Sequence, residues 1–446
     1  MLGRKVTRRN ALKIGAAASA LPLVHVSTAG AAGKVSIAFW DHWVAEGNTV
    51  MRQQVAAFAE KNKVAVQADF LSSANNQLLM TANAEAMAKT GHDIYALQSW
   101  EIHNHLDDLE PVDDVMSRLV AKYGPANQVA EYLGKSNGHW FGVPSSSGTQ
   151  MEPAEGRISI LKDAAGLDVR ELFPAQAGPQ PGDGVWTWDA HLKAAEACAK
   201  VGKPFAIGLG TTSDSVCFAG SLFAAFGAEL VNAKGEITVN SEAVRQVLEY
   251  GRRLVPVLPK DTVSYDDASN NRAMISGQSA LIFNSPSPWA VAKHDAPAIA
   301  SDIWHFTSPS GPKGRFVPYF QYFWGLWKFA QNKPAAKDLL EFLCEREQVE
   351  ARENATSGFD LPPFASMLDF KVWELAEPPK GTLYNYPIRP AHHAAPHVSG
   401  MPAPPQIAVQ IYNQATQPTM LAKLLSGQSI NDVIAWAQNE LEGFVR

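Results

Sequence analysis

Residues 35–43 read VSIAFWDHW, a short alternating apolar run that leads into tryptophan, aspartate, histidine and tryptophan. The alternation predicts a β-strand, and the aromatic and polar residues after it predict a loop at the strand end. Going outward, the chain shows a helical pattern, a second strand over 64–71, another helical pattern and a third strand over 93–99. This β-α-β-α-β order predicts parallel strands joined by right-handed crossovers. No G-x-G-x-x-G opens the first helix, so a dinucleotide-binding fold is not predicted.

Composition excludes several classes of protein. The chain has 446 residues, of which 46% are hydrophobic and 18% charged, and this mix predicts a folded chain of about two or three domains. The net charge of −6 without a basic block argues against nucleic acid as a partner and against a polybasic membrane contact. Three cysteines, Cys198, Cys217 and Cys344, lack metal-ligand spacing, so we expect no metal site and no cofactor. The sequence leaves open whether Cys198 and Cys217 form a disulfide.

The first 31 residues have the layout of an export signal. Residues 1–13 carry five basic side chains and no acid, an apolar run follows over 14–24, and Ala29-Gly30-Ala31 is a small-x-small cleavage motif. TRRNALK at 7–13 resembles a twin-arginine signal peptide. The apolar run is shorter than the ~20 residues that span a bilayer. We therefore expect cleavage after Ala31 and a periplasmic protein exported by the twin-arginine pathway.

Several segments together resemble a known family. Besides the opening strand, they are HDIYALQSW (92–100), NGHWFGVPSSS (137–147), AFGAELVNAKGEITVNSEAVRQVLEY (225–250) and SGQSALIFNSPSPW (276–289). In order and spacing they are similar to the extracellular solute-binding proteins of ABC importers, in the sugar-binding group that includes maltose-binding protein. The resemblance covers essentially the whole chain after the signal.

This resemblance implies an α/β protein with the two-lobed periplasmic binding protein fold (type II-like), in which three crossings join the lobes around a central cleft. By the same comparison, the N-terminal lobe holds 34–144 and 287–329, and the C-terminal lobe holds 150–283 and 334–446. Hinges are expected near 144–149, 284–286 and 330–333.

Candidate ligand-binding residues stand at the predicted strand ends and crossings. A sugar presents hydroxyls around its rim and C–H groups on its faces, so its recognition needs aromatic planes and planar polar side chains. Residues of these types are Trp40, Asp41, His42, Trp43, Gln98, Trp100, Ser145, Ser146, Asn284, Trp289, Tyr322 and Trp324. We expect them to bind ligand, and we expect no catalytic and no metal-binding residues.

The resemblance implies a substrate-binding protein, not an enzyme, that captures a sugar or oligosaccharide. Hinge closure would then deliver this ligand to the transmembrane permease of an ABC transporter, with the protein acting as a monomer. Two alternatives stay open. One is a polyol, glycerol-phosphate or polyamine binding protein of the same fold. The other is a secreted glycoside hydrolase, which needs a pair of carboxylates. The candidates for such a pair are Glu152, Glu155, Asp214 and Asp360.

Overall fold

The structure is a computed structural model that describes residues 24–26, 33–73, 76–174, 179–372 and 395–445. Most of the predicted signal, residues 1–31, therefore lies outside the described residues. Its described part is β1 (Val24–Val26), which pairs antiparallel with β3. Within the described ranges, no helix has both the length and the apolar character to cross a bilayer.

The predicted β-α-β-α-β unit is present near the start of the chain. Its elements are β2 (Lys34–Trp40), α2 (Ala45–Asn62), β3 (Ala65–Leu71), α3 (Gln77–Ala88) and β4 (Ile94–Gln98). Strand β2 pairs in parallel with both β3 and β4. Because parallel strands end at the same edge of a sheet, Trp40 and Gln98 come to one edge.

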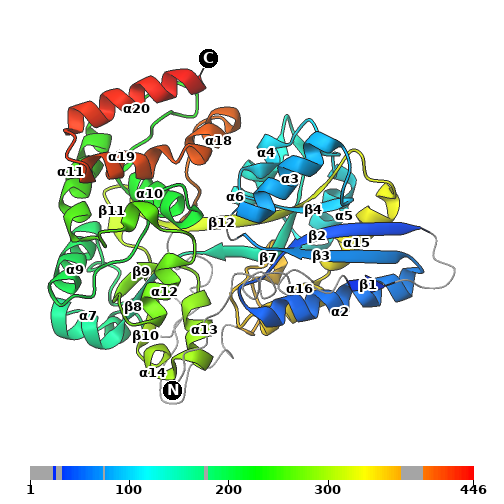
Figure 1. The fold of residues 1–446 in the computed structure, drawn as a ribbon, viewed down its shortest axis with the longest axis horizontal. Helices are drawn as coiled ribbons and strands as arrows, with labels where there is room; N and C mark the ends of the chain where they lie inside the picture. Colours follow the sequence, from blue (N-terminus) through cyan, green and yellow to red (C-terminus); the bar gives the residue numbers. More distant parts are fainter. Residues whose placement is uncertain (1–23, 27–32, 74–75, 175–178, 373–394, 446) are drawn as a thin grey trace, which may run out of the picture.

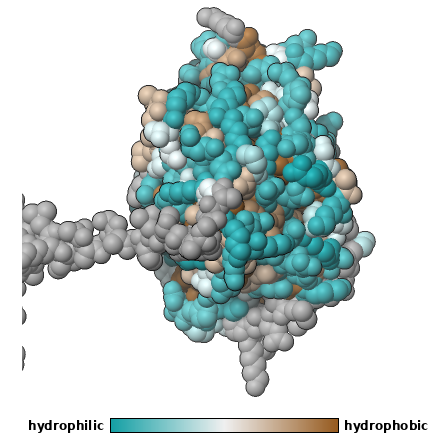
Figure 2. Space-filling view, turned by 90° about the vertical axis from the view of Figure 1, so that its right-hand side faces the viewer, coloured by the Kyte–Doolittle hydropathy of each residue, from teal (hydrophilic) through white to brown (hydrophobic). Residues whose placement is uncertain are grey.

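Two long strands complete this larger sheet. Strand β12 (Gly314–Leu326) pairs antiparallel with β4 and with β7 (Val143–Met151). Strands β12 and β7 both extend toward the second, smaller sheet of the molecule (Figure 1). Smaller elements on this side are α4 (Glu101–Asn104), α5 (Asp113–Tyr123), α6 (Gln128–Gly134), β5 (Lys135–Ser136), β6 (His139–Trp140), α15 (Lys333–Leu343), α16 (Arg346–Ala355) and η4 (Ala365–Met367). The described residues of 34–151 and 319–372 together form the first lobe. Figure 2 shows that the face of the molecule on this side is mostly hydrophilic.

The smaller sheet has the strand order β10-β8-β9, with antiparallel pairing throughout. Its strands are β8 (Ala154–Arg157), β9 (Leu281–Phe283) and β10 (Ile303–Phe306). The described residues of 152–318 and 395–445 together form the second lobe. Its helices are α7 (Ile158–Ala165), α8 (Val169–Leu172), α9 (Trp188–Lys200), α10 (Ser213–Phe226), α11 (Glu242–Leu254), η2 (Val255–Val257), η3 (Thr262–Ser264), α12 (Ser269–Ile275), α13 (Ser287–Asp295), α14 (Pro297–Ala300), α18 (Pro405–Asn413), α19 (Thr416–Leu425) and α20 (Ile430–Phe444), and its short strands are β11 (Ser310–Gly311) and β13 (Ala395–His397).

The observed division into lobes differs from the expected one in two segments. Residues 287–318, expected in the N-terminal lobe, lie in the second lobe, where β10 pairs with β8 and α13 packs on α12. Residues 334–372, expected in the C-terminal lobe, lie in the first lobe, where α15 and α16 both pack on α2 (Figure 1).

The physical reason is the length of β12. This strand pairs with β11 and β13 at its start and with β4 and β7 at its end, so the chain changes lobe inside the strand. The expected hinge at 284–286 instead joins β9 to α13 within the second lobe, and the one at 330–333 leads from β12 into α15 within the first. The hinge expected at 144–149 falls within β7, and the chain reaches β8 just after that strand ends.

Candidate functional site

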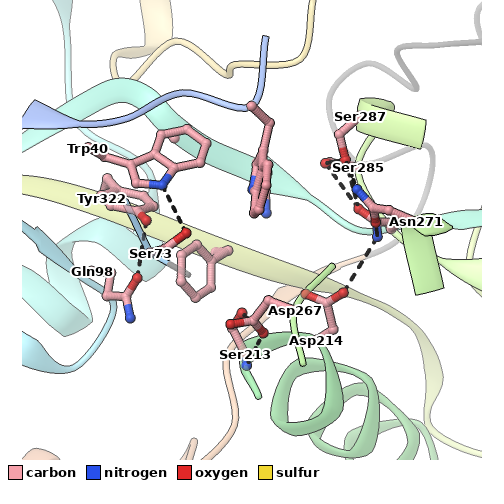
Figure 3. A pocket seen from close by; sticks show the side chains of 15 residues that line it. Trp40, Ser73, Gln98, Ser213, Asp214, Asp267, Asn271, Ser285, Ser287 and Tyr322 are labelled. Carbon is pink, nitrogen blue, oxygen red and sulfur yellow. Dashed lines mark hydrogen bonds between the residues drawn. The ribbon is translucent and has the colours of Figure 1, made fainter. Parts of the chain in front are cut away.

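A pocket lies between the two lobes, beside the strands that connect them (Figure 3). Its space, including the part open to solvent, is about 430 Å³. The lining residues are Trp40, Trp43, Ser73, Gln98, Gly148, Gln150, Ser213, Asp214, Asp267, Asn271, Asn284, Ser285, Ser287, Phe320 and Tyr322. Both lobes therefore contribute to one site, as is common for small-molecule pockets at domain interfaces.

The first-lobe wall is aromatic with polar edges. Trp40 ends β2 and stacks on Tyr322 of β12, with ring centroids 5.2 Å apart. The indole Nε1 of Trp40 donates a hydrogen bond to Ser73 Oγ at 3.2 Å, and the Tyr322 hydroxyl donates to Gln98 Oε1 at 3.1 Å (Figure 3). Trp43, at the edge of the pocket, keeps 38% of its surface exposed. These contacts fix ring planes against which an apolar ligand face can pack.

The second-lobe wall is a network of amides and hydroxyls. The Asn284 side-chain amide donates to Asn271 Oδ1 and, at 3.1 Å, to Asn270 Oδ1. Asn271 Nδ2 donates to Ser287 Oγ at 2.9 Å, and Ser285 Oγ donates to Asn284 Oδ1 at 3.2 Å. These side chains hold one another in place, so their remaining donors and acceptors are oriented before a ligand binds.

Two carboxylates stand beside this network: Asp214 in the first turn of α10, and Asp267 in the segment before α12, where it contacts Ser213 at the start of α10. Asp214 Oδ2 accepts a hydrogen bond from Asn270 Nδ2 at 2.7 Å. Asp267 Oδ1 accepts from both the backbone N and the Oγ of Ser213, each at 2.8 Å. Burial, followed by the charges of Glu152 and Asp267, raises the pKa of Asp214 well above its ordinary value. Burial likewise raises the pKa of Asp267.

The pocket collects five of the twelve expected ligand-binding residues. They are Trp40, Trp43, Gln98, Asn284 and Tyr322. The remaining seven, Asp41, His42, Trp100, Ser145, Ser146, Trp289 and Trp324, are not among its lining residues.

Five of these seven make side-chain hydrogen bonds within the protein, one of them from Ser145 Oγ to the backbone oxygen of Ser147 at 3.3 Å. Asp41 Oδ1 accepts from Asn48 Nδ2 at 2.7 Å near the start of α2, and His42 Nε2 lies 2.9 Å from Asp360 Oδ1. Trp100 Nε1 donates to the backbone oxygen of Ser399 at 2.9 Å. Ser146 Oγ accepts from the Arg352 guanidinium. Their polar atoms are therefore engaged within the protein.

Ser145, Trp289 and Trp324 are buried in the body of the lobes. Ser145 is fully covered in β7. Trp289, in α13, is buried with the Lys293 ammonium 4.6 Å from its ring. Trp324 is buried in β12, 6.2 Å from Phe39 between ring centroids, with the Arg352 guanidinium carbon 5.6 Å from its ring centroid.

Sequence reasoning missed most of the second-lobe wall. The lining residues outside the expected set are Ser73, Gly148, Gln150, Ser213, Asp214, Asp267, Asn271, Ser285, Ser287 and Phe320. Asp214 follows Thr212, which caps α10, and this cap after a strand-end loop is a signal that the sequence offers. Asp267 and Asn271 follow no predicted strand, so no comparable signal marks them.

The remaining titratable candidates are the three cysteines and the acids considered for a hydrolase. Cys198, Cys217 and Cys344 are free and buried, so Cys198 and Cys217 do not form a disulfide. Within the ranges that the structure describes, no cluster of three or more histidines, cysteines or acids is suited to a metal ion. Of the acids weighed for a hydrolase, Glu155 pairs with His305 inside the second lobe and Asp360 pairs with His42.

Comparisons with known proteins agree on family and fold. The family described as "bacterial extracellular solute-binding protein" matches residues 53–380. A probable ABC transporter-binding protein from Deinococcus radiodurans is 27% identical over 165 residues, which are 36% of this chain and 38% of that protein. The match thus spans well under half of that relative's length.

Solved structures are similar over nearly the full chain. Maltose-bound MalE3 of T. maritima aligns with a TM-score of 0.68 at 17% identity, covering 92% of this chain and 99% of the other. A sugar transporter protein from Arthrobacter chlorophenolicus with bound laminaribiose gives 0.69 at 16% identity, covering 94% and 100%. At this identity the likeness establishes the two-lobed α/β fold.

Proposed function

The chain belongs to the bacterial extracellular solute-binding proteins, and from this membership we propose that it captures a sugar or oligosaccharide between its lobes for an ABC importer. A membrane permease then takes the ligand from it. The relative from Deinococcus radiodurans is named as an ABC transporter-binding protein, and two of the similar structures hold maltose and laminaribiose. These names support the proposal for the partner and for the class of ligand.

The observation that carries the proposal is the pairing of two unlike walls in one pocket. Trp40, Trp43, Phe320 and Tyr322 supply aromatic surface from the first lobe, and Asn271 and its neighbours supply amides, hydroxyls and carboxylates from the second. A sugar has both an apolar face and a polar rim, so it can satisfy both walls at once. Micromolar binding corresponds to about −8 kcal/mol, which stacking plus a few hydrogen bonds can supply.

We further propose that the lobes close on the ligand. Because each lobe contributes one wall, a solute that contacts both walls favours the closed state over the open one by its differential affinity. Strands β7 and β12, which connect the lobes, also carry the lining residues Gly148, Gln150, Phe320 and Tyr322. Bending near these strands would move the walls relative to each other.

Export supports the same function. Proteins of an extracellular family act outside the cytoplasm, and the predicted signal over residues 1–31 supports a periplasmic location reached by the twin-arginine pathway. We propose that the mature protein acts there as a monomer.

A thermal-shift screen of the mature chain against sugars, polyols, glycerol phosphates and polyamines tests the proposal. A ligand that binds the native state alone raises the unfolding midpoint by mass action. We expect shifts with sugars, lost in Trp43→Ala and kept in Trp436→Ala, which removes a partly exposed tryptophan of α20 outside the pocket. Shifts with polyamines or phosphates alone would contradict the sugar assignment.

A further inference from the structure

The pocket has acidic side chains on one wall and, among its described lining residues, no basic side chain to balance them. Asp214 and Asp267 both line it, and none of its described lining residues is an arginine or a lysine. Figure 3 shows the two carboxylates on the second-lobe side, across the pocket from Trp40 and Tyr322. Burial makes an uncompensated carboxylate costly, so this wall favours a positive charge or a proton beside it.

A third carboxylate behind this wall, that of Glu152, also favours a positive charge or a proton nearby. Glu152 has 1% of its surface exposed, and its Oε2 atom has no hydrogen-bond partner. Its Oε1 atom accepts a long hydrogen bond, 3.4 Å, from Gln150 Nε2, and Gln150 lines the pocket. Glu152 lies close enough to Asp214 for its charge to raise the pKa of that group.

Two buried hydrogen-bond acceptors beside the pocket have no donor. Besides Glu152 Oε2, the buried Oε1 of Gln150 has no donor. A sugar hydroxyl brings one donor and no charge, whereas a protonated amine brings three donors and a positive charge. Hydrogen bonds from an ammonium group to a carboxylate are about twice as strong as neutral ones. The aromatic faces across the pocket also attract a cation.

We propose that the solute is a carbohydrate that carries a protonated amine, with the amine against Asp214 and Asp267 and the sugar ring against Trp40 and Tyr322. This inference rests on the proposed function and specifies its ligand class. It assigns the two acids to selection of an amino sugar and the aromatic wall to binding of sugar rings in general.

Matched sugars test the inference by calorimetric titration at pH 7. The disaccharide of glucosamine, its N-acetylated form and cellobiose share one linkage and differ at C2 in carrying an amine, an acetamide or a hydroxyl. Galactosamine with galactose and glucosamine with glucose supply further pairs. We expect the amine form to bind at least about tenfold more tightly than its neutral counterparts, as the loss of a charge-assisted hydrogen bond implies.

Variants separate charge from folding. Asp214→Asn and Asp267→Asn should each remove the preference for the amine while neutral sugars still bind. Asp266→Asn is the matched control, since Asp266 is an exposed neighbour that pairs with Arg272 and does not line the pocket, and it should keep the preference. The thermal midpoint of each variant checks its folding.

The outcomes distinguish this inference from the function on which it rests. If neutral sugars bind the wild-type protein as tightly as their amine counterparts, the inference is wrong and the proposed function stands. The inference is also wrong if both asparagine variants keep the full preference for the amine. If no carbohydrate binds, the proposed function and the inference both fail.

Discussion

Replacing Arg352 with methionine should destabilise the first lobe severely. Arg352 lies in α16, buried, and its guanidinium donates to Ser146 Oγ from Nε and Nη2, at 3.1 and 3.0 Å. It also donates to Gln54 Oε1 at 2.8 Å and to the backbone oxygen of Leu343 at 2.7 Å. The variant leaves these three acceptors without their buried donor.

The expected loss follows from that count of acceptors. Each buried acceptor that loses its partner costs about 1 kcal/mol or more, so the free energy of unfolding should fall by about 3 kcal/mol. Removing one member of a buried charged network gives a similar figure, about 3–5 kcal/mol. Arg352 also lowers the pKa of the buried Glu353, which burial and then Asp360 raise, so its loss further penalises the ionised carboxylate.

Urea denaturation of wild type and variant measures this loss. Arg346→Met in the same helix is the matched control, because Arg346 pairs with Asp369 at the surface and should lose about 1 kcal/mol or less. Ser146 belongs to β7, which also supplies Gly148 and Gln150 to the pocket, so Arg352→Met should weaken sugar binding as well. A loss no larger than that of Arg346→Met would refute the reasoning.

Three further predictions concern the pocket wall, pH and the thiols. Gly148 has φ +86°, and a Cβ there would lie 2.5 Å from the Tyr322 ring. Gly148→Ala should therefore lower both the stability, measured by urea melts, and the sugar affinity, measured by calorimetry. Gly138 has φ +85° with nothing within 4 Å, so the control Gly138→Ala should cost only the backbone strain of about 1–2 kcal/mol. Equal losses of stability in the two variants would contradict this. Burial lowers the pKa of His92, but Glu85 and Asp69 outweigh it and raise that pKa above 6.5. The stabilisation that protonated His92 gives the folded state is thus complete below pH 6.5 and is lost as pH rises through the folded-state pKa. Urea melts at pH 6 and 8 should therefore show a lower free energy of unfolding at pH 8. His92→Gln should reduce this difference, whereas the exposed control His139→Gln should keep it. Finally, a thiol reagent should label none of the three buried cysteines in the native protein and all three in denaturant; rapid labelling of the native protein would show that a thiol is accessible.

The sequence predicts the aromatic half of the pocket better than the polar half. Trp40 and Gln98 close parallel strands of one sheet, and strand periodicity alone brings such ends together. Asp267 and Asn271 come from a loop and a short helix, and their position depends on how α10 and α12 pack in the second lobe. Periodicity carries no information on that packing.

Long-range pairs explain the expected residues that lie elsewhere. His42 follows a strand end as a ligand-binding residue would, but Asp360, which lies 318 positions away, holds its ring. In the same way, Ser146 accepts a hydrogen bond from Arg352, which lies in a helix of the first lobe. From the sequence, that helix is expected in the C-terminal lobe. A single sequence does not reveal such partners, because neither residue type nor spacing marks them.

Calorimetric titration of a sugar from the thermal-shift screen into wild type, Trp43→Ala and Asn271→Ala tests the central claim most directly. The two variants alter opposite walls of one pocket, Trp43 in the first lobe and Asn271 in the second. If the ligand binds between the lobes, each variant should weaken binding by about tenfold or more, as loss of a stacking or hydrogen-bond contact implies. Wild-type affinity in either variant, with both folded, would contradict a site shared by the two lobes.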